Sequence, residues 1–256
     1  MNILAVGDVV GSAGCEYLRR RLPALKKLKG IDLVVVNGEN SADGNGITPS
    51  SAQHLFDSGA DVITTGNHVF RRREVYDFLD SRGDIVRPAN YSAACPGTGY
   101  TVIDKGRVQI GVINLSGMAY MPQAENPFTC VDEVLKKLSG CRIILVDIHA
   151  EATAEKKALG YYLDSRVSAV FGTHTHVQTA DARVLRGGTG YITDLGMTGP
   201  AESVLGVNPQ TSVNWLKTGM PARFDTAEGD CMLNGCIFEI DDKTGLALSA
   251  EGICME

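Results

Sequence analysis

The sequence has no surplus of positive charge. Its 24 lysines and arginines are outnumbered by 30 aspartates and glutamates, which gives a formal net charge of -6. Proteins that bind duplex nucleic acid usually present a basic face, so this balance argues against duplex DNA or RNA as a partner. It does not exclude a small phosphate ester as substrate, because bound metal ions can supply the positive charge that a phosphate needs locally.

Paired cysteines and long apolar runs are also missing. The seven cysteines form no C-x-x-C pair. Their odd number, the lack of a signal peptide and a start directly on an apolar run indicate free thiols in a reducing cytoplasm. No apolar run approaches the roughly 20 residues that a membrane-spanning helix needs. We therefore expect a soluble, cytoplasmic protein with no membrane partner.

The chain further lacks Pro- or Ser-rich linkers, internal repeats and low-complexity segments. Its 256 residues fit one large domain, so a single domain over residues 1–256 is expected. A chain of this size buries roughly three quarters of its unfolded surface, so its core needs neither disulfides nor a structural metal.

Short apolar runs and helical patterns alternate through most of the sequence. Apolar spacing and end signals predict helices at residues 18–28, 48–59, 71–79 and 131–138. Apolar runs predict strands at residues 2–7, 33–36, 62–65, 110–114, 143–148 and 167–171. Such repeated strand–helix units indicate a parallel core sheet with right-handed crossovers.

The final third of the chain has a different pattern. Turn signals such as Gly-Gly and Asp-Asp separate short runs at residues 182–185, 191–193, 235–240 and 246–251. This hairpin-like pattern predicts a second, mostly antiparallel sheet. The predicted fold class is therefore α/β, a four-layer α/β/β/α sandwich of two mixed sheets flanked by helices.

Five of the short apolar runs end in side chains that can hold a metal ion. In chain order these are Asp8, Glu39 with Asn40, Asn67 with His68, His149, and His174 with His176. The carboxyl ends of neighbouring parallel strands meet at one edge of a sheet, so these side chains are expected to converge. The set offers carboxylate, amide and imidazole donors without thiolate, which suits Mn, Fe or Zn.

The five sites differ in how much each one indicates alone. Asp8 could simply cap the following helix, and a lone His149 is more often a core residue than a ligand. The pair His174-x-His176 is more specific, because alternate residues of an extended backbone point to the same side. Taken together, the five sites predict a metal centre.

Two metal ions sharing one carboxylate would explain the number of donors. Glu39 is the natural bridge, because one carboxylate can span ions about 3.5–4 Å apart. Such a pair generates hydroxide near neutral pH and screens the charge of a phosphoryl group under attack. His68 sits beside a ligand without needing to be one, and imidazole titrates near neutrality, so His68 is the candidate proton donor to the leaving oxygen.

These blocks also carry a resemblance to a known family. GDVVG, NGEN, GNH, IHAE and GTHTHVQTAD match, in order, the pattern of calcineurin-like metallophosphoesterases. The chain resembles in particular the bacterial YmdB-like subfamily, whose members resemble 2′,3′-cyclic-nucleotide 2′-phosphodiesterases. The likeness extends through RPAN, ALGYYLD and YITDLGMTGP, and so covers nearly the whole chain.

The resemblance implies a role for each site residue. It implies Asp8, Glu39, Asn40 and His176 around one metal, and Glu39, Asn67, His149 and His174 around the other, with His68 as proton donor. Val10 stands where the wider superfamily has a histidine, and Glu39 where it has a bridging aspartate; both departures are typical of the subfamily. The implied cofactors are two divalent or mixed-valence ions, Fe and/or Mn, with Zn as an alternative.

The leading hypothesis is a phosphodiesterase that opens 2′,3′-cyclic nucleotides by metal-activated hydroxide attack and leaves a 3′-phosphate. One alternative keeps the centre but widens the substrate, giving a general phosphodiesterase or nucleotidase. Another is a regulatory or RNA-associated protein with incidental hydrolysis, for which the sequence offers only the arginine runs at residues 19–21 and 71–73. Short exposed edge strands favour a homo-oligomer.

Three further residues have open roles at this stage. Arg87 would face either a phosphate or, more commonly, a surface carboxylate. Asp194 and Thr198, in TDLGMTG, either contact the substrate or support the ligands, or else belong to a tight turn built on Gly196 and Gly199.

Overall fold

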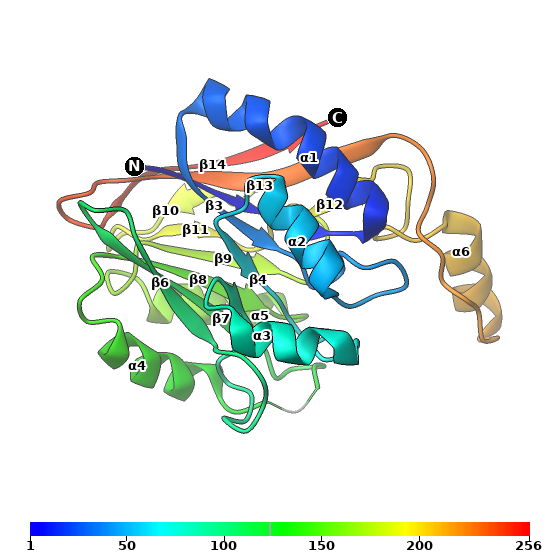
Figure 1. Ribbon diagram of the computed structural model, residues 1–256, viewed down its shortest axis with the longest axis horizontal. Helices are drawn as coiled ribbons and strands as arrows, with labels where there is room; N and C mark the ends of the chain where they lie inside the picture. Colours follow the sequence, from blue (N-terminus) through cyan, green and yellow to red (C-terminus); the bar gives the residue numbers. More distant parts are fainter. Residues whose placement is uncertain (123) are drawn as a thin grey trace.

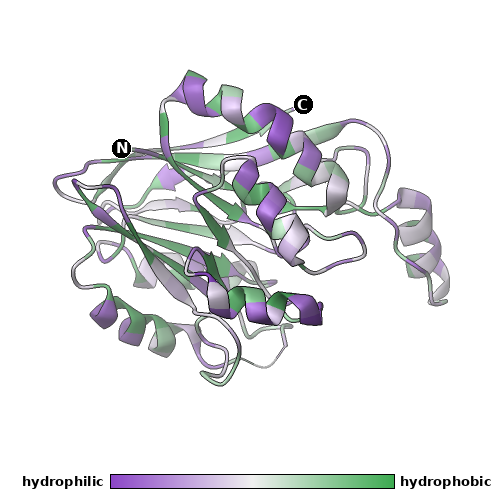
Figure 2. Ribbon diagram, viewed as in Figure 1, coloured by the Kyte–Doolittle hydropathy of each residue, from purple (hydrophilic) through white to green (hydrophobic). Residues whose placement is uncertain are grey.

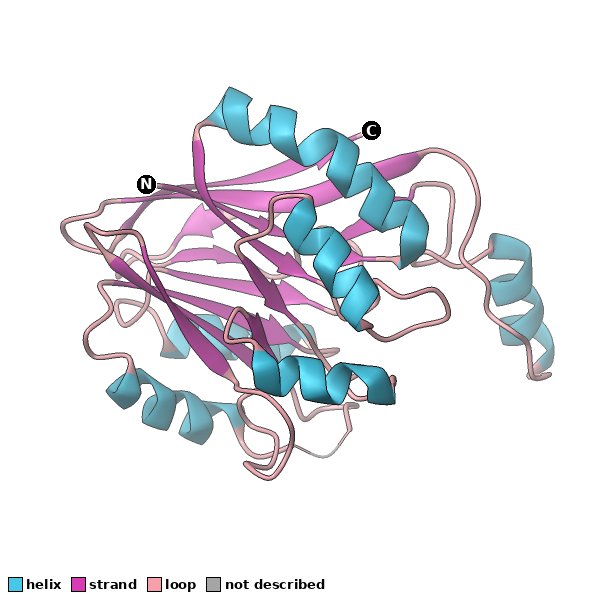
Figure 3. Ribbon diagram, viewed as in Figure 1, coloured by secondary structure: helices cyan, strands magenta, loops and turns pink. Residues whose placement is uncertain are grey.

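Two mixed β-sheets lie face to face in the computed structural model, and helices cover the outer face of each (Figures 1 and 3). The structure describes residues 1–122 and 124–256. The predicted α/β/β/α sandwich is confirmed.

The first sheet contains strands from both ends of the chain. They are β1 (Asn2–Val6), β2 (Asp8–Val9), β3 (Ile31–Asn37), β4 (Val62–Thr64), β5 (Ile85–Val86), β12 (Met197–Pro200), β13 (Cys231–Ile240) and β14 (Ala247–Met255). Their order is β2-β12-β13-β1-β3-β4-β5, with β14 paired to β13.

The second sheet is built from the middle of the chain. Its strands are β6 (Tyr100–Asp104), β7 (Gln109–Ser116), β8 (Ile143–His149), β9 (Ala169–Thr173), β10 (Arg183–Val184) and β11 (Gly190–Ile192), in the order β10-β11-β9-β8-β7-β6.

The parallel strands are divided between the two sheets. Strands β1, β3, β4 and β5 pair in parallel in the first sheet, and β7, β8, β9 and β11 do so in the second. The prediction that the final third forms a second, mostly antiparallel sheet is wrong: β12 to β14 extend the first sheet, while β10 and β11 extend the second. Turn signals show where a strand reverses, but they do not show which distant strand it joins, and β13 pairs with β1.

The helices match the predicted positions with two additions. They are α1 (Gly11–Lys29), α2 (Pro49–Asp57), a 3-10 turn (Arg73–Val75) leading into α3 (Tyr76–Ser81), α4 (Pro127–Lys137), α5 (Thr153–Tyr162) and α6 (Pro209–Thr218). Helices α5 and α6 were not predicted. For α6 a signal was present, because Asn208 accepts hydrogen bonds from the N–H groups of Gln210 and Thr211, and Pro209 follows in the first turn.

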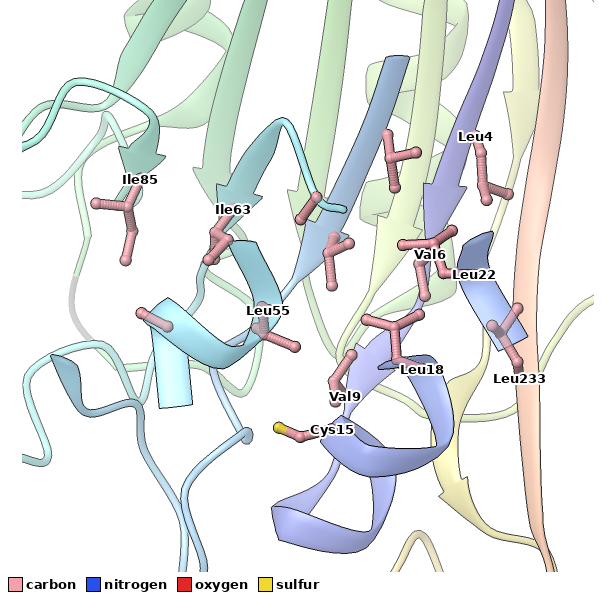
Figure 4. Close-up of a cluster of buried hydrophobic side chains, with 14 of the residues drawn as sticks. Leu4, Val6, Val9, Cys15, Leu18, Leu22, Leu55, Ile63, Ile85 and Leu233 are labelled. Atoms are coloured by element: carbon pink, nitrogen blue, oxygen red, sulfur yellow. The ribbon is translucent and has the colours of Figure 1, made fainter. Parts of the chain in front are cut away.

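Three apolar layers hold the sandwich together. Alternate residues of β1 pack into two of these layers, one on each face of the strand. Leu4 and Val6 of β1 face Leu18 and other side chains of α1 and α2 (Figure 4), whereas Ile3 and Ala5 pack against the second sheet. The third layer lies between the second sheet and helices α4 and α5. Figure 2 shows the result as hydrophobic central strands and helices that turn hydrophilic residues outward.

Helix α6 lies outside these layers. It stands at the edge of the molecule in Figure 1, on the excursion between β12 and β13, and most of its residues are exposed. Among the described residues, none of the helices has the length and apolar character to cross a membrane. All seven cysteines are free thiols, as expected.

Candidate metal centre

The predicted metal-binding side chains meet where strands of both sheets end. Asp8, Glu39 with Asn40, and Asn67 with His68 follow strands β1, β3 and β4 of the first sheet. His149 ends β8, and His174 and His176 follow β9, both in the second sheet. The contacts described below join all eight into one cluster, which we call the floor.

Glu39 lies at the middle of the floor and is fully buried. Its Oε1 accepts a hydrogen bond from Asn40 Nδ2 at 3.0 Å and lies 3.1 Å from His149 Nε2 and 3.2 Å from His68 Nδ1. Its Oε2 accepts the backbone N–H of His68 at 3.0 Å. One carboxylate therefore contacts side chains from both sheets.

On one side of Glu39 lie Asp8, Asn40 and His176. His176 Nε2 is 3.6 Å from Asp8 Oδ1 and 3.3 Å from Asn40 Nδ2. On that side the donor atoms are a carboxylate, an amide and an imidazole.

On the other side of Glu39 lie Asn67, His149 and His174. His149 Nε2 is 3.1 Å from Asn67 Oδ1 and 3.1 Å from His174 Nδ1. Ligand atoms of Glu39, His149 and His174 all lie within 4.8 Å of one another, which is close enough for one ion to touch all three. Glu39 therefore lies between two sets of donor side chains, which are also joined directly, because the backbone N–H of His174 donates to Asp8 Oδ2 at 3.1 Å.

The chemistry of the floor fits a bound cation. Asp8 Oδ1 is buried and has no hydrogen-bond partner among residues 1–122 and 124–256. A buried carboxylate oxygen without a partner is costly, and a metal ion would satisfy it. Gly66 is also required, because a Cβ there would lie 2.3 Å from the His149 ring and 2.4 Å from Glu39 Oε2.

The electrostatics of the floor point the same way. Burial alone would raise the pKa of the Glu39 carboxyl, but His149 and His68 beside it lower that pKa well below its usual value. Burial alone would lower the pKa of His149, but the carboxylates of Glu39 and Asp8 raise it to about 9. Burial and the charge of His149 lower the pKa of His174 to about 4. The buried carboxylates thus favour positive charge between them.

Asp147, which was not predicted, supports His149 from below. Its buried carboxylate accepts hydrogen bonds from Thr64 Oγ1 at 2.5 Å, Thr173 Oγ1 at 2.7 Å and Asn37 Nδ2 at 3.1 Å. Thr173 Oγ1 also lies 2.9 Å from His149 Nδ1. Because the threonine hydroxyl donates to Asp147, it accepts from Nδ1, and Nε2 is directed at the floor. The signal was an aspartate interrupting the apolar run before His149.

Asp194 supports the loop that carries the other two histidines. Its Oδ2 accepts from Lys156 Nζ at 2.6 Å, from Thr175 Oγ1 at 2.6 Å and from the Thr175 N–H at 3.2 Å. The side chains of Lys156 and Asp194 are each 1% exposed. Asp194 therefore holds the residue between His174 and His176, which is the supporting role weighed for it.

The backbone of this loop corrects one interpretation. His174 and His176 were expected on extended backbone with parallel side chains, but both have positive φ, 95° and 60°. Their rings consequently serve different sides of the floor. Positive φ is uncommon for residues other than glycine and needs support from the surroundings, which Asp194 gives through Thr175.

His68 lies where the floor opens to solvent, and its side chain is 19% exposed. Its Nδ1 is 3.1 Å from Asn40 Oδ1, and its Nε2 is 3.3 Å from Asn45 Nδ2. Arg72 holds the loop of Asn45 in place, donating to the carbonyls of Asp43 at 2.6 Å and Asn45 at 3.0 Å. The Gly-Asn-Gly sequence around Asn45 was the available signal for this loop.

A cleft of about 1020 Å³ opens above the floor. Glu39, Asn40, His68, His174 and His176 of the floor line it. Its far side is lined by residues of the excursion at 201–230, which includes α6, and we call this segment the outer wall.

Two residues with open roles lie away from the cleft. Arg87 is buried and donates to the carbonyls of Pro88, Ser92 and Pro96. Both interpretations of it were wrong, since it contacts carbonyl groups of its own loop rather than a phosphate or a surface carboxylate. Thr198 is fully buried in β12, where it pairs with Leu233 and Val9.

Comparison with known proteins gives the same family along the whole chain. The profile of the family described as YmdB-like protein matches residues 4–253. A 2′,3′-cyclic-nucleotide 2′-phosphodiesterase of Bacillus subtilis is 45% identical over 254 residues, covering 99% of this chain and 96% of that protein.

Solved structures agree on the fold. The crystal structure of a phosphatase from Mycoplasma pneumoniae has a TM-score of 0.94 and 35% identity, with 100% of this chain and 93% of that chain covered. A Haemophilus influenzae NAD nucleotidase shares the fold at 12% identity, with a TM-score of 0.63 over 99% of this chain and 55% of that one.

Proposed function

This chain belongs to the YmdB-like family and is a phosphoesterase, and on that premise we propose that it hydrolyses 2′,3′-cyclic nucleotides to 3′-phosphates at a dinuclear metal centre. The observation that carries the proposal is the position of Glu39, a buried carboxylate that contacts two groups of donor side chains at once. The substrate class rests on the name of the 45% identical relative.

The floor supplies the ligands in this proposal. Asp8, Asn40 and His176 would hold one ion, Asn67, His149 and His174 the other, and Glu39 both. Mixed oxygen and imidazole donors suit Fe, Mn or Zn. When bound, two such ions lower the pKa of a shared water and offset the negative charge of the phosphoryl group.

His68 is the proton donor in this proposal. The 2′ oxygen that leaves is basic and needs a proton. Of the three histidines that line the cleft, His174 and His176 are assigned here to the ions, which leaves His68 free to donate. Asn40 and Asn45 lie against its two ring nitrogens and keep the ring turned between floor and substrate.

The arginine runs do not favour the RNA-associated alternative. Arg19 pairs with Glu16 on the same helix, and Arg72 is engaged with the loop of Asn45. We also propose that residues 1–256 act as one domain, because Ile3 and Phe238, near opposite ends of the chain, share the apolar layer between the sheets.

The test is metal analysis of the purified protein together with product identification. We expect Fe, Mn or Zn to copurify and 2′,3′-cyclic AMP to give 3′-AMP. Rates on 3′,5′-cyclic AMP and 5′-AMP are measured beside it. Comparable rates on all three would replace this proposal with the broader phosphodiesterase or nucleotidase, and 2′-AMP as product would show that the other P–O bond breaks.

A further inference from the structure

The volume of the cleft exceeds what a cyclic phosphate bound to the floor would fill. Small-molecule sites usually enclose about 300–1,000 Å³, and this cleft measures about 1020 Å³. A cyclic phosphate on the floor would leave most of that volume free. The space toward the outer wall therefore has room for the rest of a substrate.

The outer wall is an ordered structure rather than a free loop. Its two limbs pair with each other: the N–H of Asn208 donates to the carbonyl of Asp225 at 3.1 Å, and that of Ala227 to Gly206 at 2.9 Å. It is also joined to the floor, because His176 Nδ1 lies 3.1 Å from the carbonyl oxygen of Leu205. A group bound against this wall would thus be held at a fixed position relative to the floor.

The wall lines the cleft with an aromatic ring and an aliphatic side chain, next to an ion pair in which Arg223 Nε lies 3.3 Å from Asp225 Oδ1. Phe224 and Leu205 both line the cleft and are 42% and 46% exposed. Trp215 of α6 packs against Phe224 edge to face, with ring centroids 5.5 Å apart and an interplanar angle of 82°. This contact steadies the ring, and the exposure of Phe224 leaves part of it available to a ligand.

A polar floor for a phosphate, and a wall that presents an aromatic ring and an aliphatic side chain, form a site for a ligand with a phosphate and a planar apolar face. We propose that the part of the outer wall that lines the cleft is the nucleobase subsite, with the ring of Phe224 stacking on the base and Leu205 packing beside it. This inference rests on the proposed function. Stacking on an aromatic ring is tolerant of base identity, so the four 2′,3′-cyclic nucleotides should be turned over at similar rates.

The test compares a substrate that has a base with one that lacks it. The metal-loaded full chain and its Phe224→Ala variant are assayed on 2′,3′-cyclic AMP and on methyl ribofuranoside 2′,3′-cyclic phosphate. We expect kcat/KM on the nucleotide to fall by about 10- to 100-fold, mainly through KM, and kcat/KM on the baseless substrate to stay unchanged. Phe224→Trp should retain the activity on the nucleotide.

Leu216→Ala provides the matched control, because Leu216 lies on the same helix excursion, is 71% exposed and is not among the cleft residues of the described chain. It should leave both substrates unaffected. Equal losses on both substrates for Phe224→Ala, or no loss on either, would overturn the subsite while the wild-type activity stands. A wild-type enzyme that holds metal but turns over neither substrate would overturn the proposed function and this subsite with it.

Discussion

The floor and the outer wall of the cleft are built in opposite ways. Asp8, Glu39 and His149 of the floor are fully buried, and their polar atoms face one another over short distances. On the wall, the side chains of Leu205 and Phe224 are nearly half exposed. The floor is thus fixed by many simultaneous interactions, while the wall is fixed mainly by its own backbone pairing.

This difference separates two tasks. Buried charged groups are costly unless each has partners in good geometry, so a change at one of them disturbs the rest. An exposed apolar surface contributes to binding roughly in proportion to the area of ligand surface that it removes from water. Substitutions in the floor should therefore remove metal or turnover, and substitutions in the wall should change KM.

The largest effect is expected at Glu39. Glu39→Gln keeps the size of the side chain but removes the charge that both groups of donors share. We expect the bound metal to be largely lost and turnover to fall below detection, as measured by elemental analysis and by hydrolysis of 2′,3′-cyclic AMP. Glu16→Gln, at an exposed glutamate on α1, is the control and should change neither. A Glu39→Gln protein with full metal content would show that this carboxylate is not the bridge.

His68 tests whether a floor residue can act without holding metal. His68→Ala should lower kcat by about 10²–10⁴-fold, because the leaving oxygen loses its proton donor, while metal content is unchanged. His54→Ala removes another partly exposed histidine, on α2, which lies 3.9 Å from Glu16, and should have no effect. Loss of metal from the His68→Ala protein would make His68 a ligand and end its role as acid.

Breaking the buried ion pair of Lys156 and Asp194 should have a smaller effect on turnover but a clear effect on stability. Lys156→Met leaves Asp194 as an unpaired buried charge, which should lower the free energy of unfolding by about 3–5 kcal/mol. It should also weaken metal binding by about 10- to 100-fold, because the loop of His174 and His176 loses its support. Thermal unfolding of the metal-free protein and metal titration measure the two effects.

The neighbouring lysine provides the control for that experiment. Lys157 pairs with Asp181 at 3.4 Å, and their side chains are 40% and 30% exposed. Lys157→Met should therefore cost at most about 1 kcal/mol and leave metal binding unchanged. If the two lysine variants behave alike, burial of the Lys156–Asp194 pair has no role in holding the loop.

The residues of the floor can be predicted from sequence patterns much better than those of the wall. The floor lies at the ends of strands that short apolar runs identify, and its residue types are ones that commonly bind metal ions. Asp147 was missed, and the role of Asp194 was left open between several alternatives, because both roles depend on which residues pack against these carboxylates. Their contacts with Thr173 and Thr175 are set by the tertiary structure rather than by spacing in the chain.

The predictions of the second sheet and of helix α6 were wrong or missing for a related physical reason. The pairing of β13 with β1 joins opposite ends of the chain, and no local pattern specifies such a partner. For α6, the cap at Asn208 and Pro209 marks where a helix begins. It does not reveal that the helix stands outside the layers, nor that Trp215 meets Phe224.

The smallest effect is expected from removing the N-cap of α6, Asn208. This change most clearly distinguishes the role of the wall from that of the floor. Asn208→Ala removes the side-chain acceptor of two N–H groups and should cost α6 about 1 kcal/mol. Asn126→Ala is the matched control. It makes the same change at the N-cap of α4, where Asn126 also accepts hydrogen bonds from two N–H groups and is also followed by proline. Because α4 packs on the second sheet, its variant should lower the global unfolding temperature and leave KM unchanged.

Helix α6 is mostly exposed, so fraying it should barely move the unfolding temperature. It should instead speed hydrogen exchange within α6 and raise KM for 2′,3′-cyclic AMP a few-fold, because Trp215 no longer steadies Phe224. Metal content should match the wild type, since the floor is untouched. Faster exchange in α6 with an unchanged KM would mean that the ring of Phe224 keeps its position without the helix, and that the backbone pairing of the wall is enough to hold it.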